Sequence, residues 1–181
     1  MSYDLQFFTP RPGVDVRDIV ETDDGPARGK RNPTIEAKKR KLADALLAHD
    51  ARLELLEPDF NMVARLHKMR VEEAYERIRH LELADMTKES SGIQIILFDD
   101  SASLTIPYWH NGDAARRVLQ DAWGMIEIIC RDTGYEVFDP QLDRVIDVNA
   151  FEDVLRSYAG TTQRMEALIG RVAKKPWWKF W

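Results

Sequence analysis

Apolar and polar side chains alternate over residues 2–8, where the apolar positions are Tyr3, Leu5 and Phe7. This period of two predicts a strand that pairs within the main sheet and ends before Pro10. Proline, glycine and aspartate are frequent in residues 11–33, so we expect an irregular arm there, with a helical turn or two only at residues 14–20.

A helix is expected to begin at Asn32 and Pro33, because asparagine is a good N-cap and proline fits the first helical position. Leucines and alanines at spacings of three, four and seven extend the helical pattern to about Leu56, and Pro58 ends it. Residues 60–79 are highly charged and also favour helix. Residues 80–83 fit the beginning of a strand as well as the end of that helix.

The clearest β pattern lies in residues 92–109. Two apolar runs, around Ile95 and around Ile106, are separated by Asp99, Asp100 and Ser101, and this arrangement predicts a hairpin. The first run is apolar almost throughout, which indicates an interior strand.

Two further helices are expected in the second half of the chain. The first begins at residues 111–113, keeps one apolar face over four turns and ends at Gly134. Short strands at 135–138 and 145–148 flank a turn at residues 139–141. The last helix covers residues 150–173, with a division at Gly160 as one alternative.

This order of elements predicts an α+β fold with a mainly antiparallel sheet and helices packed on one face. A ferredoxin-like arrangement with additions is our first choice of topology. We expect one domain over residues 1–173, including the arm at 11–33, followed by an aromatic and basic tail at 174–181.

The opening Met-Ser-Tyr-Asp-Leu, the hairpin and the segment 135–141 carry a loose resemblance to small uncharacterised bacterial proteins with the same opening. The resemblance covers the first strand and residues 92–147. Some of the proteins that look like this are assigned to toxin-immunity neighbourhoods, so the resemblance implies an immunity-like role as one expectation. It brings no catalytic residue with it.

Composition narrows the classes of function. The chain has 181 residues, a formal charge of -5 and a pI near 5.4, and this acidity argues against nucleic-acid binding. The single cysteine excludes an internal disulfide framework and suits a reducing compartment. No apolar run is long enough for a membrane span and no secretory leader is evident, so we expect a cytoplasmic protein.

His110 is the candidate catalytic residue, because it lies where a strand passes into a helix and free backbone N-H groups can hold an anion beside an imidazole. The alternative, which we favour, is that Asn111 or Asp113 caps the helix and His110 lies at the surface. The four histidines lack any zinc spacing, and Asp139, Asp143 and Asp147 lack the spacing of a calcium loop. The sequence therefore predicts no metal site and no cofactor, and Cys130 belongs to an apolar helix face.

The tail contains three of the five tryptophans of the chain and three lysines. Its candidate binding residues are Lys174, Lys175, Trp177, Trp178, Lys179, Phe180 and Trp181. They can fold back on the domain or on a second copy, bind a protein partner, or contact anionic lipid weakly.

The sequence thus favours a non-enzymatic interaction protein of the immunity type, which binds a partner through a sheet edge, the arm or the tail. A small enzyme or ligand-binding domain centred on His110 is the first alternative. A peripheral membrane protein held by its tail is the second.

Overall fold

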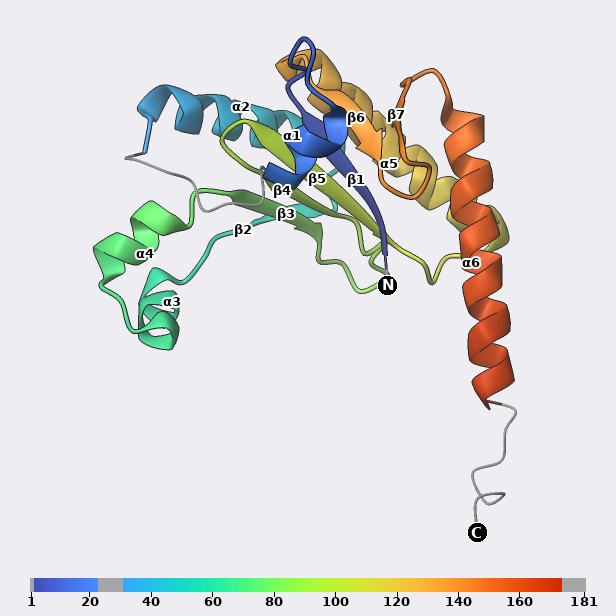
Figure 1. Ribbon diagram of the computed structural model, residues 1–181. Coiled ribbons are helices and arrows are strands. Elements are labelled where there is room, and N and C mark those ends of the chain that lie inside the picture. The colour runs from blue at the N-terminus through green and yellow to red at the C-terminus, as the bar shows by residue number, and fades with distance from the viewer. Residues whose placement is uncertain (1, 23–30, 174–181) are drawn as a thin grey trace.

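Seven strands form one antiparallel sheet in the order β2-β3-β4-β5-β1-β6-β7 (Figure 1). The computed structural model describes residues 2–22 and 31–173. Its strands are β1 (Ser2–Phe8), β2 (Leu53–Leu56), β3 (Leu81–Asp85), β4 (Gln94–Leu97), β5 (Ser101–Pro107), β6 (Glu136–Asp139) and β7 (Arg144–Ile146). Its helices are α1 (Val16–Thr22), α2 (Pro33–His49), α3 (Phe60–His67), α4 (Val71–Arg77), α5 (Gly112–Thr133) and α6 (Phe151–Ala173). The predicted α+β class and antiparallel sheet are confirmed, whereas the ferredoxin-like topology is not.

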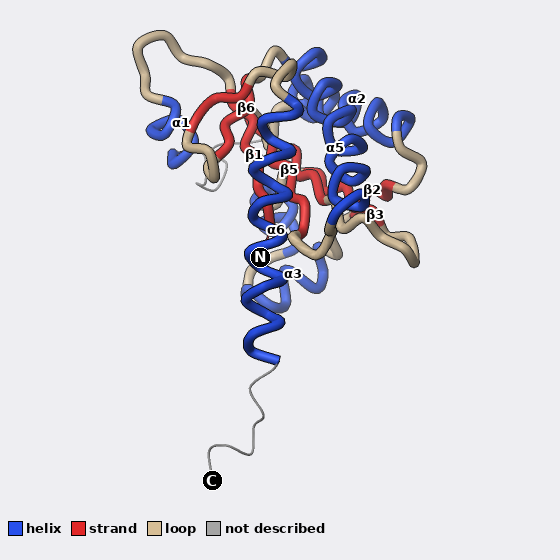
Figure 2. The backbone as a smooth tube through the Cα atoms, turned by 90° about the vertical axis from the view of Figure 1, so that its right-hand side faces the viewer, coloured by secondary structure: helices blue, strands red, loops and turns tan. Residues whose placement is uncertain are grey.

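The strand register separates the two faces of the sheet. Leu5 lies opposite Leu104, and Leu104 lies opposite Ile95, with all three fully buried. Because successive side chains of a strand point to opposite faces, these residues define a core face and their neighbours define an open face. Helices α2 and α5 cover the core face, while the short α1 lies on the opposite side (Figure 2).

Helix α1 covers only one corner of the open face. Its Ile19 packs with Phe8 of β1 and Phe138 of β6 in a small apolar cluster. These two phenylalanines have the even-numbered positions that the register assigns to the open face. The predicted helical turn at residues 14–20 thus exists two residues later in the chain, and it has a packing role.

Three tyrosines fix α6 to the end of the sheet. The Tyr158 hydroxyl donates to the Pro107 carbonyl at 2.7 Å, and its ring packs against those of Tyr3 and Tyr108, with centroids 5.6 and 5.8 Å away. Burial raises the pKa of Tyr158, so the hydroxyl stays a donor at neutral pH. Beyond Thr162, which is buried, α6 continues past the body of the sheet (Figure 1).

The predicted helix from Asn32 to Leu56 is too long. Asn32 caps it as expected, accepting from the Thr34 N-H at 2.9 Å, but the helix ends at His49. Asp50 leaves the helical conformation, and Leu53–Leu56 forms the edge strand β2 beside β3. Leucine is compatible with both structures, and here burial of Leu53 in the sheet prevails over helix propensity.

Other boundaries differ in smaller ways. The helical stretch expected at 60–79 is two helices, because Lys68 adopts a left-handed conformation with φ of 53°. Residues 81–85 are strand, and the strand expected at 145–148 is Arg144–Ile146. Helix α6 runs through Gly160 without a division, and α5 ends at Gly134 as predicted.

Gly92 offers a direct test of the packing at the end of β5. Its φ is +70°, and a Cβ added there would lie 2.6 Å from Pro107 and 2.5 Å from the Trp109 ring. Gly13 has a similar φ of +77° but nothing within 4 Å of the added atom. We expect Gly92→Ala to lower the free energy of unfolding by about 1–3 kcal/mol more than Gly13→Ala does, as overpacking would. Denaturant unfolding of both variants measures the difference, and equal losses would show that Trp109 and Pro107 yield freely.

Candidate interaction surface

His110 links the end of the sheet to the loop between β3 and β4. Its Nε2 lies 2.6 Å from the Ser91 carbonyl oxygen. Because a carbonyl oxygen only accepts, Nε2 carries the hydrogen in this contact and only Nδ1 remains as a base. Asn111 occupies the N-cap position of α5 without a side-chain hydrogen bond, so the predicted cap exists in position only.

The loop that His110 contacts is held by Asp85. Its carboxylate accepts four hydrogen bonds, from the N-H and hydroxyl of Thr87 at 3.0 and 2.6 Å and from those of Ser91, both at 2.7 Å. Burial alone would raise the pKa of Asp85, but these hydrogen bonds outweigh it and lower the pKa to about 2. His110 and Asp85 thus fix one loop between them, and His110 does not line the hollow on the open face described below.

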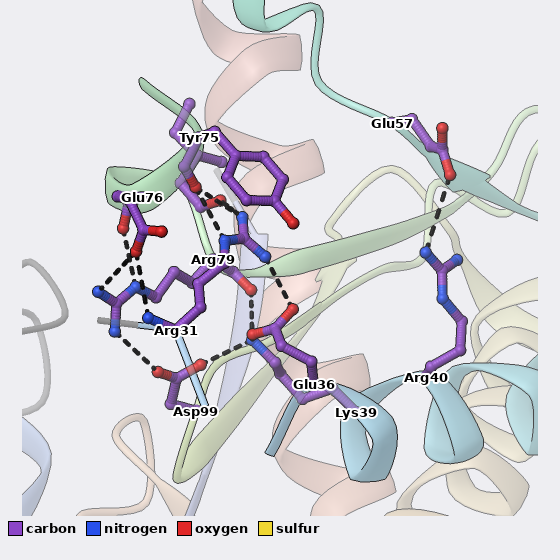
Figure 3. Close-up of polar contacts among 10 residues, drawn as sticks. Arg31, Glu36, Lys39, Arg40, Glu57, Tyr75, Glu76, Arg79 and Asp99 are labelled. Carbon is purple, nitrogen blue, oxygen red and sulfur yellow. Dashed lines mark hydrogen bonds and ion pairs between the residues drawn. The ribbon is translucent and has the colours of Figure 1, made fainter. Parts of the chain in front are cut away.

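A second group of charged side chains joins α2 to α4, the α4-β3 loop and the β4-β5 turn (Figure 3). Lys39 is 5% exposed, and its Nζ lies 2.6 Å from Asp99 Oδ1 and 2.8 Å from Glu36 Oε1. The same Nζ donates to the Arg79 carbonyl. The ammonium group of Lys39 thus donates two hydrogen bonds, to Arg79 and Asp99, and forms ion pairs with both carboxylates.

Two arginines complete this group. Arg31 donates to the Tyr75 carbonyl at 2.7 Å and to Glu36 at 2.8 Å, and its guanidinium lies 4.0 Å from the centre of the Tyr75 ring. Arg79, also 5% exposed, lies 3.6 Å from Asp99. Each charge therefore has a partner of opposite sign, and the group attaches α4 and the β4-β5 turn to α2.

The open face of the sheet differs from this group of paired charges, because its polar side chains point away from the core. The register places small polar side chains and four carboxylates on it: Asp4, Gln6, Glu54, Glu82, Gln94, Ser103, Thr105 and Glu136. Asp4 accepts from Thr105 at 2.8 Å and from Ser2 at 3.0 Å. Among the strand residues described, this face carries no lysine or arginine.

His80 does not add positive charge to this face. It lies against Phe98, with ring centroids 6.0 Å apart, where the face meets the β4-β5 turn. Burial lowers the pKa of His80, so the ring is neutral at pH 7. Among the described strand residues, the open face therefore carries carboxylates and no charged base.

A shallow hollow of about 230 Å³ lies on this face between β1, β5 and α1. Asp4, Gln6, Ser103 and Thr105 line its polar side, and Phe98 and Val20 supply apolar walls. Phe98 is 37% exposed. The hollow can therefore take a side chain that has an apolar body and a positive or hydrogen-bonding end.

The structure also places the acidic residues and the cysteine that the sequence analysis considered. Asp139 is fully buried and accepts from the N-H groups of Gln141 and Leu142, whereas Asp143 pairs with Arg17. Within residues 2–22 and 31–173, no group of histidine, cysteine and acidic side chains could hold a metal ion. Burial raises the pKa of the Cys130 thiol to about 11, as expected for a residue of the apolar helix face.

The predicted binding residues of the tail, Lys174 to Trp181, lie outside the described residues. No described helix is both long and apolar enough to cross a bilayer.

Comparison with known proteins finds no match to the chain. No protein-family model matches the chain. No curated protein and no solved structure is similar to it either.

Sequence reasoning did not identify the open face as a site. Asp4 and Gln6 were visible as the polar half of an alternating strand, but which strands lie beside β1 decides whether such positions form one surface. The absence of lysine and arginine from every strand except β7 is a signal in the sequence that could have indicated an acidic sheet face.

Lys39 and Arg40 test the distinction between buried and exposed charges (Figure 3). Lys39→Met removes a charge that faces two carboxylates and a carbonyl, and we expect a loss of about 3 kcal/mol in the free energy of unfolding. Arg40 lies 3.8 Å from Glu57, and both side chains are at least half exposed. Arg40→Met should cost less than about 0.5 kcal/mol. Urea unfolding of the two variants checks the contrast, and similar losses would contradict a structural role for Lys39.

Asp85 should make the free energy of unfolding depend on pH. A carboxyl group whose pKa is lower in the folded than in the unfolded state stabilises the fold above the unfolded pKa of about 4. That contribution is lost as the pH falls toward about 2. Asp85→Asn turns amide hydrogens toward the donors of Thr87 and Ser91, and we expect a loss of about 2 kcal/mol at pH 7 that shrinks below pH 4. Denaturant unfolding at pH 7, 4 and 3 measures this, with the exposed Asp44→Asn as control.

Proposed function

We propose that this protein is a non-enzymatic interaction protein that binds a basic surface of another protein on the open face of its sheet. The observation that carries the proposal is the presence of Asp4, Glu54, Glu82 and Glu136 on a face where no described strand residue is lysine or arginine. Complementary charge steers a basic partner toward such a face and suppresses acidic partners.

The charge of the whole chain supports the same partner chemistry. The chain carries -5, and four basic residues but no acidic residue lie after residue 170, so residues 1–170 carry -9. A body of this charge attracts cations from a distance of about a Debye length, roughly 8–10 Å at physiological salt. Association with a basic protein is then fast and sensitive to salt.

The sheet edges are poorer binding sites than the face. β2 has four residues and Pro58 follows shortly after it, and β7 has three residues and follows Asp143, which has φ of 52°. Short edge strands beside a proline or a left-handed residue discourage the addition of a further strand. We therefore assign binding to the open face in preference to the edges.

The polar side chains that most resemble those of an enzyme site are already bonded within the protein, which favours a binding role over a catalytic one. The hydrogen on His110 Nε2 is donated to Ser91, and Lys39 donates to the Arg79 carbonyl and to Asp99 and pairs with Glu36. The resemblance to bacterial proteins near toxin-immunity systems is compatible with this role, because an immunity protein acts by covering its target. The single half-buried cysteine fits the cytoplasm.

Neutralising the face tests the proposal. Asp4→Asn, Glu54→Gln and Glu82→Gln together remove three charges while keeping side-chain shape. The control Asp44→Asn, Glu89→Gln and Glu127→Gln makes the same change in net charge at exposed positions outside the open face. In affinity capture from native lysate at physiological salt, we expect the wild type and the control to retain a basic protein that the face variant loses at least tenfold. Retention of the same proteins by all three chains would reject the proposed face.

A further inference from the structure

The C-terminal end of the chain has the chemistry that the open face lacks. Arg171, Lys174, Lys175 and Lys179 are its charged residues, and three tryptophans and a phenylalanine lie among them. No other segment of the chain combines clustered positive charge with aromatic side chains at this density. Aromatic and basic residues together are typical of segments that dominate a binding interface.

The open face offers partners for both kinds of side chain. Glu82 lies opposite Leu56, two residues along β2 from Glu54, so these carboxylates are diagonal neighbours on adjacent strands. Ile96, opposite Glu82 on β4, and Phe98 provide apolar surface beside them. Beyond these strands lies the hollow lined by Asp4 and Thr105. Lysines can pair with the carboxylates while aromatic rings cover Ile96 and Phe98.

The position of α6 decides which copy of the chain can supply this segment. From the buried Thr162, eleven further residues lead to Ala173, about 16 Å at the helical rise of 1.5 Å per residue. Figures 1 and 2 both show this part of α6 projecting beyond the sheet. Eight further residues reach at most about 26–29 Å.

Within one copy, the path back along α6 and across the sheet to β3 takes up the whole of this reach. The tail would return about 16 Å along α6 and then cross the three strand spacings from β1 to β3, about 14 Å. Only its last residues could then meet Glu54 and Glu82. A second copy has no such constraint, because its open face can approach the projecting end of α6 directly.

We propose that residues 174–181 of one copy bind the acidic open face of a second copy, and that the exchange is reciprocal. The two copies then form a closed dimer in which each tail neutralises the face of the other, as a two-fold interface requires. This inference rests on the proposed function, since it identifies the first basic partner of the same face as the protein itself.

Charge reversal followed by mixing tests the exchange with full-length chains. The first chain carries Glu54→Lys and Glu82→Lys, and the second carries Lys174→Glu, Lys175→Glu and Lys179→Glu. Each chain alone brings like charges together, so both should sediment as monomers where the wild type is a dimer. In an equimolar mixture every tail meets a face of opposite charge, and we expect the dimer to return.

The controls separate this result from loss of folding and from nonspecific charge effects. Asp44→Lys with Glu127→Lys makes the same charge change on exposed positions of α2 and α5, and this chain should remain a dimer. If the reversed face unfolds, as circular dichroism would show, Glu54→Gln with Glu82→Gln replaces it. This milder change should weaken dimerisation at least tenfold.

Several outcomes would overturn the inference. These are a monomeric wild type, dimers of both reversed chains, or a mixture that stays monomeric. Flotation of a monomeric wild type with phosphatidylserine-containing vesicles, lost in the chain with the reversed tail, would assign the tail to lipid instead. A monomeric wild type whose open face still captures a basic protein from lysate would leave the proposed function intact and reject only the exchange between copies.

Discussion

The pairing of β1 with β5 is the constraint on which the rest of the structure depends. Seven residue pairs run from Ser2 opposite Pro107 to Phe8 opposite Ser101, and they place β1 between β5 and β6. A slip by one residue would turn Tyr3, Leu5 and Phe7 out of the core and bring Asp4 and Gln6 into it. The register is therefore fixed by burial, and the composition of the open face follows from the same alternation.

That alternation divides the charged residues into two populations with different roles. Lys39, Arg79 and Asp85 are buried, and each is held by partners within the chain. Removing one member of such a set leaves buried groups without partners, which is why these residues govern stability. The carboxylates of Glu54, Glu82 and Glu136 lie on the open face, and in the proposed function they govern association.

The sequence predicted most elements because their patterns were long or had clear ends. β1, the β4-β5 hairpin and α5 were evident from alternation, from the Asp99-Asp100 turn and from Gly134. The end of α2 was not, because the leucines at 53, 55 and 56 satisfy a helical stripe and a strand equally, and only pairing with β3 decides between them. The candidate surface could not be predicted for the same reason. It consists of side chains from strands far apart in sequence, and their order in the sheet is a property of the whole fold.

Like charges on one face carry a cost that a partner removes. Diagonal neighbours such as Glu54 and Glu82 repel one another, and at a surface this repulsion amounts to a few tenths of a kcal/mol per pair. Small alternatives such as the serine and threonine of β5 occupy equivalent positions without that cost, so strand formation does not require the carboxylates. The repulsion is present in the free protein, and the proposed binding of a basic segment would relieve it. Binding therefore gains both the new ion pairs and the release of this repulsion, which makes an uncompensated acidic face better suited to holding a basic partner than a face of balanced charge.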